Sequence, residues 1–568
     1  MAAALLPLPA LAKIEIAVPN VSETIQTNVR AFLSLTRYAE RDDVTDEVMS
    51  RLQRRIVSET RQALEPLGYY EPQVAYDVKK EGEIWKVTIQ VEPGRPVRLS
   101  EVAVNATGPG ANDRAIRELI DAEEIKPGLR LNHGTYERVK GNLVRVAKNE
   151  GYLDARLTKH DLVIDRSERR ATVALEVDTG ERYHFGEIEI AQDVITDEAM
   201  RRLLRMKSGD PYTLETLLRT QYVLDDTQYF SVVDIESGDP NHDTRTVPIT
   251  VTAEPSRKHR YAAAAGYGTD TKVRGKFTWD NRRVNEAGHK FKLELLGSSI
   301  VTDLTGRYAI PVMDIALEKL EFTGTLRDEE LGDTTSERAE IGAGLTQVLG
   351  RWQRVLQLRL SNETTTEADG TSSENFYLVP SVSFSTLPSY IVGGRRRPYS
   401  LSAELRGSPE TLGSDASFIQ LRLKGERVFD MSELWHLHLR SEMGISRIAA
   451  TSDLPASQRF FAGGEGSVRG FALNELSPRD DQDRTIGGRN LATGTVEVVR
   501  DLPRNFGVAA FYDIGNAFDD FSDPQLEYAA GLGVRYNIAV ASFGIDIAQA
   551  LSESGRSPRV HLYIATQF

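Results

Sequence analysis

The sequence predicts three small α+β modules followed by a sixteen-stranded antiparallel transmembrane β-barrel. Two observations favour this fold class. Residues 13–256 repeat a helix followed by a strand hairpin, and residues 257–568 alternate apolar and polar side chains in strand after strand. A third observation excludes a helical membrane protein, because no stretch of 18 or more consecutive apolar residues occurs.

Composition narrows the function classes. The chain has 568 residues, of which 40% are hydrophobic, and 69 Lys and Arg stand against 83 Asp and Glu for a net charge of -14. A general nucleic-acid binder is usually basic, so that class is excluded. The chain has no cysteine, which excludes thiolate catalysis, disulfides and cysteine-ligated zinc.

Residues 1–12 are apolar and end in Ala10-Leu11-Ala12 before Lys13. This ending resembles the last part of a secretory signal with an A-x-A-like cleavage site. The alternatives are a frayed hydrophobic terminus or a start codon placed too late. We expect a signal-peptide remnant here, since the rest of the chain has the features of an exported protein.

The repeat in the first half predicts modules at residues 13–95, 96–180 and 181–256. In the first copy, a helical pattern from Asp46 to Leu67 stops at Gly68, a residue that commonly ends helices, and two strand patterns follow. Gly68 and its counterpart Gly151 lie 83 positions apart. Each module should therefore hold a helix followed by a hairpin, although such a fold does not by itself fix a function.

The second half predicts a barrel rather than a soluble sandwich. Leu356, Leu358 and Leu360, for example, alternate with polar neighbours, which suits either a face in water or a face in lipid. An even number of strands, with short connections at one end and longer polar ones at the other, favours the barrel. The sixteen predicted strands are 260–267, 274–280, 289–296, 303–310, 318–325, 338–345, 353–362, 376–385, 400–407, 417–428, 434–445, 492–499, 506–514, 527–535, 541–548 and 559–568.

Several connections should be loops. The acidic run 327–330 and the Ser/Thr-rich segment 364–375 are expected to lie outside the strands. The longest connection, residues 447–491, contains Val468-Arg469-Gly470-Phe471 among repeated glycines. Loops of this length are usually functional or disordered. The glycine spacing does not fit a dinucleotide or phosphate loop, and no Lys-Ser/Thr follows.

Three motifs in this region resemble those of the BamA/TamA superfamily of outer-membrane barrel-assembly and translocation proteins. Val468-Arg469-Gly470-Phe471 is similar to the family's VRGF motif on an inward-folded loop. Glu497 is similar to its strand glutamate, and Phe511-x-Asp513-x-Gly515 to its F-x-D-x-G motif. The order of parts also agrees, with POTRA modules before a barrel that ends in the aromatic residue Phe568. Three modules, rather than five or two, favour the TamA branch.

The resemblance implies a function. It implies an insertase/translocase in the bacterial outer membrane, with periplasmic POTRA modules, that assists autotransporters and other outer-membrane proteins by lateral opening of the barrel seam. It also implies a TamB-like inner-membrane-anchored partner and unfolded outer-membrane protein clients, with no enzyme activity, cofactor or nucleic acid. Phe568 would serve as the C-terminal barrel signal. The alternatives are a two-partner-type secretion pore and a BamA-like general assembly subunit. A barrel enzyme is disfavoured, because the sequence contains no nucleophile or metal motif.

Strand parity brings the motif residues together. Glu497 has the opposite parity to Val496 and Val498, and Phe511 and Asp513 share a parity. The side chains of Glu497, Phe511 and Asp513 should therefore face the lumen. An Arg469 carried inward would meet two carboxylates, and a bidentate guanidinium–carboxylate pair fixes geometry. We therefore expect a structural or gating lock rather than a catalytic site.

The barrel seam is the second candidate site. The first strand is rich in Ala and Gly, including Gly266 and Gly268, and such strands pack and pair poorly. The last strand carries Thr566 near its end. A weak seam between these strands is consistent with lateral opening.

Overall fold

The computed structural model describes residues 14–566 apart from 40, 42–43, 83, 123, 388–398, 449–452 and 539–540. The predicted signal segment 1–12 and Phe568 lie outside the described residues. The chain forms two compact units, one with residues 1–189, 206–219 and 235–251, the other with 190–205, 220–234 and 252–568. The second unit thus combines the barrel with parts of the third module.

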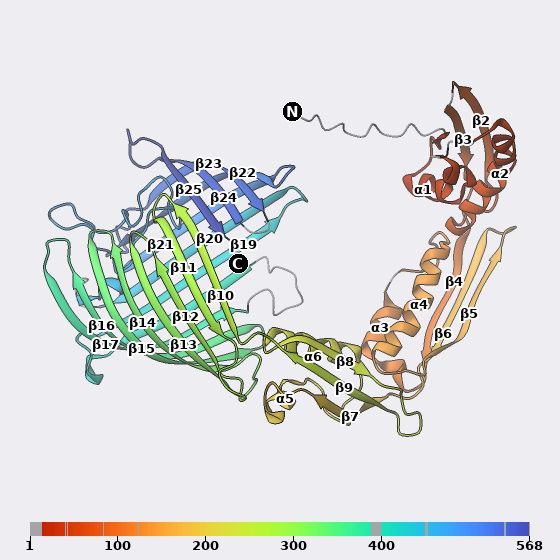
Figure 1. Cartoon of the computed structure of the whole chain (residues 1–568). Coiled ribbons are helices and arrows are strands. Elements are labelled where there is room, and N and C mark those ends of the chain that lie inside the picture. Colours follow the sequence, from red (N-terminus) through yellow and green to blue (C-terminus); the bar gives the residue numbers. More distant parts are fainter. Residues whose placement is uncertain are drawn as a thin grey trace, which may run out of the picture. The chain divides into compact units, whose positions relative to one another are not determined.

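Within residues 14–255 as described, the chain forms three three-stranded sheets, each with its own helices (Figure 1). Each module runs strand, helix, helix, strand, strand, and its first strand lies beside its last. The first module contains β1 (Ile14–Ala17), α1 (Glu23–Phe32), α2 (Asp46–Leu64), β2 (Gln73–Glu81) and β3 (Ile84–Glu92). The second contains β4 (Arg98–Thr107), α3 (Arg114–Asp121), α4 (His133–Asn149), β5 (Arg156–Asp165) and β6 (Arg170–Asp178). The third contains β7 (His184–Ala191), α5 (Asp197–Leu203), α6 (Leu214–Asp226), β8 (Phe230–Ser237) and β9 (Thr246–Pro255).

The predicted helix and hairpin are present in each module, but the sequence analysis missed the leading strand and the shorter helix. β1 has only four residues, too few to show an alternating pattern. It pairs in parallel with β3, whereas the sequence analysis predicted only an antiparallel hairpin. The predicted helix end is present: Gly68 follows the helical segment with φ +85°, a backbone conformation that favours glycine.

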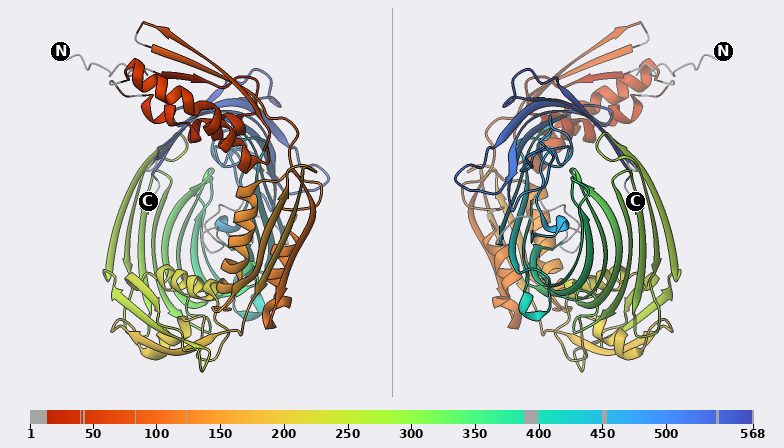
Figure 2. Two further views of the ribbon diagram at one scale, coloured as in Figure 1. Left: turned by 90° about the vertical axis from the view of Figure 1, so that its right-hand side faces the viewer. Right: turned by 90° about the vertical axis from the view of Figure 1, so that its left-hand side faces the viewer.

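Within the residues that the structure describes, sixteen antiparallel strands, β10 to β25, form a closed barrel (Figures 1 and 2). This confirms the predicted barrel and its strand number. The strands are β10 (His259–Gly268), β11 (Lys272–Asn281), β12 (Lys290–Gly297), β13 (Val301–Pro311), β14 (Lys319–Leu331), β15 (Thr334–Leu349), β16 (Trp352–Thr366), β17 (Ser372–Thr386), β18 (Tyr399–Ser408), β19 (Phe418–Asp430), β20 (Trp435–Arg447), β21 (Asn490–Asp501), β22 (Phe506–Phe518), β23 (Glu527–Ile538), β24 (Ala541–Ala550) and β25 (Arg559–Thr566). We call the end where β10 begins the proximal end and the opposite end the distal end.

Several strands extend further at the distal end than predicted. The acidic run 327–330 was expected to be a loop but belongs to β14, and much of 364–375 belongs to β16 and β17. These residues pair in register, as Glu329 does with Ser336. Apolar alternation marks only the part of a strand that faces lipid, so the polar extension carries no such signal.

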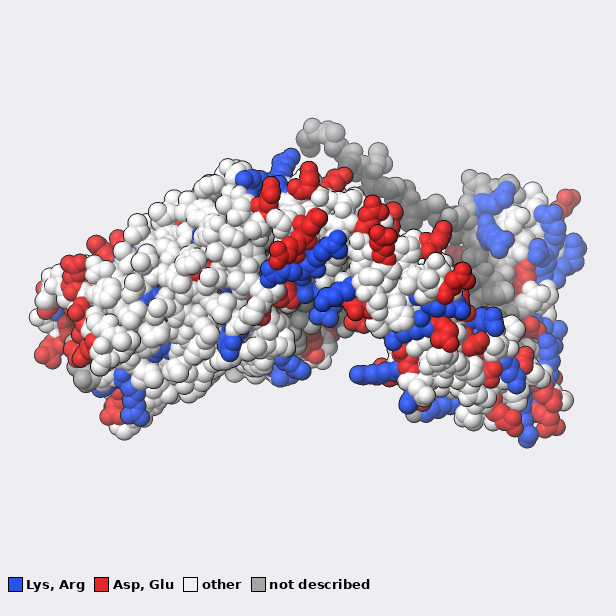
Figure 3. All heavy atoms as spheres, turned by 90° about the horizontal axis from the view of Figure 1, so that it is seen from below, with Lys and Arg blue, Asp and Glu red and all other residues white. Residues whose placement is uncertain are grey.

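The outer wall of the barrel is apolar. Leu532 and Ile547, for example, lie side by side on β23 and β24 and are 68% and 55% exposed. Over a broad area this surface carries few charged side chains (Figure 3). None of the helices in the described part of the chain is long and apolar enough to cross a membrane.

Segments of the third module contact turns at the proximal end of the barrel, within the same compact unit. The Tyr229 hydroxyl donates to the carbonyl of Gly288 at 2.5 Å, and Lys290 Nζ donates to the carbonyl of Thr227 at 2.7 Å. Arg205 pairs with Asp314 at 2.8 Å. This part of the module is therefore fixed to the barrel by side-chain bonds to backbone and carboxylate groups.

Candidate functional site

The segment that carries the VRGF motif folds into the barrel lumen. It connects β20 with β21, is described from residue 453, and part of it lies inside the ring of strands in Figure 2. Val468 and Phe471 are both fully buried. They pack in an apolar cluster inside the barrel. The remaining members of this cluster are Phe460, Ala462, Leu476, Leu491, Ala517, Ala529 and Ala550.

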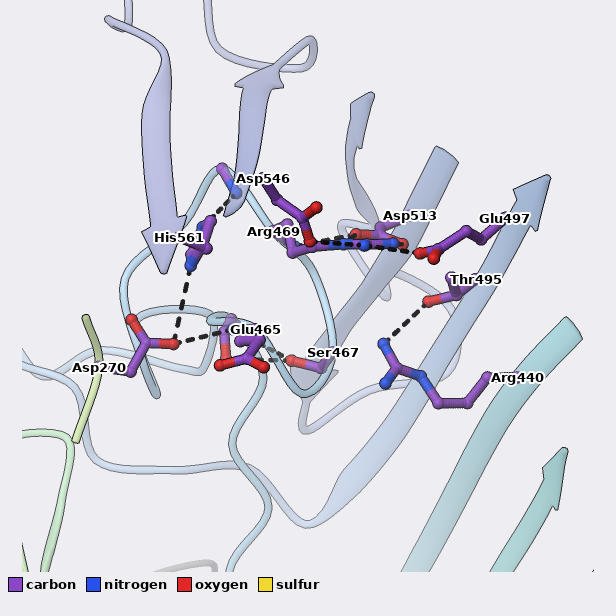
Figure 4. A network of polar contacts seen from close by, with 12 residues as sticks. Asp270, Arg440, Glu465, Ser467, Arg469, Thr495, Glu497, Asp513, Asp546 and His561 are labelled. Carbon is purple, nitrogen blue, oxygen red and sulfur yellow. Dashed lines mark hydrogen bonds and ion pairs between the residues drawn. The ribbon is translucent and has the colours of Figure 1, made fainter. Parts of the chain in front are cut away.

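Arg469 is the centre of the site (Figure 4). Its Nε and Nη2 donate to the two carboxylate oxygens of Asp513 at 2.7 and 3.0 Å, which is a bidentate pair. Its Nη1 donates to Glu497 at 2.8 Å, and its backbone N–H donates to Asp513 at 3.1 Å. The guanidinium carbon lies 3.3 Å from the centroid of the Phe511 ring, a cation–π contact. The structure thus brings together the four residues that the motifs singled out.

Two further charged residues complete the cluster, and the sequence analysis missed both. Asp546 on β24 accepts from Arg469 Nη1 at 3.1 Å. Arg535 on β23 donates to Asp546 and, at 3.2 Å, to Glu497. The sequence held a signal for Asp546, because it is the one charged residue in an otherwise apolar and small-residue strand and has the opposite parity to Ile545 and Ile547.

The cluster contains two guanidinium groups and three carboxylates, and its centre is buried. Arg469 is 3% exposed, Asp546 1% and Asp513 0%. Burial alone would lower the pKa of the Arg469 guanidinium, but the hydrogen bonds and charges of Asp513 and Glu497 raise this pKa. A guanidinium that is permanently charged does not exchange protons with a substrate. The arrangement is suited to holding the loop in one position.

Steric contacts explain why glycine occupies positions 470 and 515 of the two motifs. Gly470 has φ +95°, and a Cβ there would lie 3.1 Å from the backbone nitrogen of Ala550. A Cβ on Gly515 would lie 2.5 Å from the carbonyl oxygen of Ala492. Gly470 lets the loop backbone approach β24, and Gly515 lets β22 lie close to β21.

Other parts of the same loop are bonded to a different part of the wall. Arg459 Nη2 pairs with Glu367 at 2.6 Å. The Thr485 backbone N–H donates to Asp333, in the turn between β14 and β15, at 2.7 Å. These bonds hold the loop at places separate from the Arg469 cluster, which contacts β21, β22 and β24.

The seam joins β10 to β25 and is short. Among the described residues, all ten of β10 pair with β11, but only Tyr267 and Gly268 pair with β25, opposite Ile564 and Tyr563. The next bond toward the distal end runs from the Thr269 N–H to the Leu562 carbonyl at 3.0 Å. For the proximal part of β10, the structure gives no pairing with the described residues of β25.

The structure places the three predicted seam residues differently from one another. Gly268 pairs with Tyr563, while Thr566 pairs with Ala541 of β24 and has no partner in β10. Gly266 lies one residue beyond the pairing, and a Cβ there would lie 2.8 Å from both Arg274 Nε and the Ile564 carbonyl oxygen. Arg274 passes over this glycine and donates to that carbonyl at 3.4 Å.

A closed sixteen-stranded barrel, a lumen-seated loop locked by an arginine and a preceding series of small α/β modules define the class of outer-membrane barrels with N-terminal modules. The chain belongs to the Omp85 superfamily: the model described as "Omp85 superfamily domain" matches residues 200–568, and "POTRA domain TamA domain 1" matches residues 15–93. These matches confirm the resemblance to the BamA/TamA superfamily and place the barrel in an outer membrane.

Curated relatives are named outer membrane protein assembly factor BamA. The one from Nitratidesulfovibrio vulgaris is 24% identical over 64% of this chain and 48% of its own length, and the one from Buchnera aphidicola is 21% identical over 37% of this chain and 33% of its own length. The chain thus spans about half and a third of these relatives. The crystal structure of BamA from Haemophilus ducreyi lacking POTRA domains 1–3 has the same fold, with TM-score 0.64 and 14% identity over 83% of this chain and 100% of that one.

Proposed function

We propose that this chain assists the insertion of outer-membrane proteins, autotransporters among them, through lateral opening of the seam between β10 and β25. The observation that carries the proposal is the seam itself. Counting only described residues, two residues of β10 pair with β25, whereas all ten pair with β11 on the other side. A ladder of this length is the place where the barrel wall opens at the smallest cost.

An open seam would expose what a client strand needs. An unpaired edge presents free backbone N–H and C=O groups, which readily pair with another strand. Within the part of the chain that the structure describes, the proximal part of β10 already has this character in the closed barrel. Small side chains at Ala262–Ala265 leave its surface able to accept strands of varied sequence.

The modules would lie in the periplasm as three POTRA modules, where they would meet clients and a TamB-like inner-membrane-anchored partner. The match of residues 15–93 to a TamA-type POTRA domain supports this assignment. The first module has its own buried core, including Met49, Leu52, Ile56 and Leu64, so it has the independence that a docking module requires. No enzymatic step enters this function.

A BamA-like general assembly subunit would share this mechanism and differ in its clients, whereas a two-partner-type secretion pore would use the lumen. The lumen contains the seated loop, whose residues Val468, Arg469 and Phe471 are all buried. This observation favours a route through the wall over a route through the lumen.

The test is to lock the seam. The chain has no cysteine, so Tyr267→Cys with Ile564→Cys gives a single possible disulfide between directly paired residues. We expect the locked barrel to stay folded in the outer membrane and to lose client assembly, with recovery on reduction. The control is Leu532→Cys with Ile547→Cys, a paired, lipid-facing position away from the seam. Normal client assembly by the locked seam would refute lateral opening.

A further inference from the structure

The loop segment 463–471 is bonded to both sides of the seam. On one side, the Glu465 backbone N–H donates to Asp270 Oδ2 at 2.8 Å, and Asp270 lies in the turn between β10 and β11. On the other side, the Gly470 backbone N–H donates to His561 Nε2 at 3.2 Å, and His561 lies on β25. Figure 4 shows these two bonds beside the Arg469 cluster. The segment therefore bridges the two strands that share so few backbone bonds.

Both anchoring side chains are buried and have few other partners. The Asp270 side chain is 5% exposed and that of His561 is 0% exposed. Among the described residues, Asp270 Oδ1 and His561 Nδ1 have no hydrogen-bond partner. A buried polar group that loses its partner is costly, so each anchor is stabilised while the loop is seated.

The bond from Gly470 also fixes the tautomer of His561. Because Nε2 accepts, the proton of a neutral imidazole is on Nδ1. Nδ1 lies 3.8 Å from Asp270 Oδ2, too far for a hydrogen bond but close enough for attraction across the seam. The two sides of the seam thus face each other with a donor and an acceptor.

Two glycines of the segment are required by this arrangement. Gly464 has φ +88°, and a Cβ there would lie 2.7 Å from the same Asp270 oxygen that Glu465 uses. Gly470 has a comparable conformation beside β24. A larger residue at either position would displace the loop from one of its two anchors.

We propose that segment 463–471 is a clasp that holds the seam closed, with Asp270 and His561 as positioning residues on its two sides and Arg469 as its fixed point on the wall. Because the loop can bind Asp270 and His561 together only while the two strands lie side by side, seating of the loop and closure of the seam are coupled. Release of the clasp would regulate seam opening, and this role rests on the proposed function. The clasp itself is inferred from the hydrogen bonds of Glu465 and Gly470 alone.

The test measures seam closure directly, as the rate of disulfide formation between Tyr267→Cys and Ile564→Cys in native outer membranes. We expect Asp270→Ala and His561→Ala each to lower this rate about tenfold, the effect of one lost hydrogen bond to a charged or buried group. Asp270→Asn keeps an acceptor oxygen for Glu465 and should restore most of the rate.

The matched control is Asp333→Ala, which removes an equivalent turn aspartate that holds the same loop at Thr485, away from the seam. It should leave the seam rate within about twofold. The pair Leu532→Cys with Ile547→Cys reports whether each variant barrel is folded. An unchanged or faster seam rate in Asp270→Ala and His561→Ala, with the barrel folded, would overturn the clasp. The clasp and lateral opening fail separately, because a slowed seam rate would support the clasp even if the locked seam assembled clients normally.

Discussion

The barrel has two joints at which the backbone ladder is short, and they are closed in different ways. Among the described residues, β10 and β25 share two paired positions, and β17 and β18 share five. Neighbouring strands elsewhere pair over greater lengths, as β15 and β16 do over fifteen positions. The two joints differ in the groups that replace the missing backbone bonds.

At the joint between β17 and β18, residues of the adjoining β18–β19 loop replace the missing ladder. Pairing stops at Ser381, directly after Pro380, which has no N–H to donate. Beyond this point the N–H of Leu378 donates to Ser414 Oγ at 3.0 Å, and the N–H of Phe376 donates to Asp415 at 2.6 Å. The edge of β17 is thereby capped, one way in which proteins prevent unwanted strand addition.

At the seam, the replacement groups come from distant parts of the chain. The clasp brings residues near 465 to a turn at 270 and to a strand at 561. A cap made by the neighbouring loop re-forms at once after it breaks, but a contact between distant segments depends on a separate element being in place. We therefore expect the first joint to stay closed, and the second to be closed only while the clasp is seated.

The largest expected effect comes from removing the fixed point of the clasp. Arg469→Ala leaves Glu497, Asp513 and Asp546 without this cation, and breaking a buried ion pair costs about 3–5 kcal/mol. We expect the barrel to remain inserted, while the loop leaves its position and client assembly fails. Protease cleavage within 463–471 on intact cells and heat-modifiable gel migration would measure loop position and barrel folding.

Two variants sharpen this result. Arg469→Lys should rescue poorly, because an ammonium cannot make the bidentate pair with Asp513. Arg459→Ala removes the loop's other buried arginine, which pairs with Glu367 away from the seam, and should loosen the loop without the same loss of assembly. Equal protection from protease and equal assembly in Arg469→Ala and the unaltered chain would remove Arg469 from the mechanism.

The sequence predicted the lock more fully than the clasp, for a physical reason. The sixteen strands and the meeting of Arg469 with Glu497 and Asp513 follow from apolar alternation and from parity, which are local patterns. Asp270 and His561 carry no pattern of their own, because one is a turn aspartate and the other a polar residue on a strand. Their proximity depends on closure of the barrel, which joins residues 291 positions apart.

The register between β10 and β25 could likewise not be predicted from the sequence. The proximity of Gly266 and Gly268 to the last strand followed from their place in the first strand, but Thr566 could not be aligned with either one. A shift of one residue turns every side chain to the opposite face, and only the paired backbones define it.

An intermediate effect is expected at the seam glycine. Gly266→Ala places a methyl group 2.8 Å from Arg274 Nε and from the Ile564 carbonyl, so the bond between them is lost and β25 is displaced. We expect the seam disulfide between positions 267 and 564 to form about three- to fivefold more slowly, as for one weak hydrogen bond. Gly275→Ala is the matched control, since a Cβ there meets nothing within 4 Å. Equal rates in the two variants would show that Arg274 does not help to close the seam.

The smallest expected effect is at the capped joint. Ser414→Ala removes the acceptor for the Leu378 N–H and should lower the free energy of unfolding by about 1 kcal/mol, the usual cost of one unsatisfied neutral donor. Client assembly and the seam disulfide rate should not change, because Leu378 and Ser414 lie on strands and a loop away from β10 and β25. Denaturant unfolding of the purified barrel measures the first effect, and the 267–564 pair measures the second. Asp415→Asn keeps an acceptor for Phe376 and serves as the control at the same joint. A loss of assembly in Ser414→Ala comparable to that in Gly266→Ala would mean that both joints open during function, and the distinction between a permanent and a conditional closure would fall.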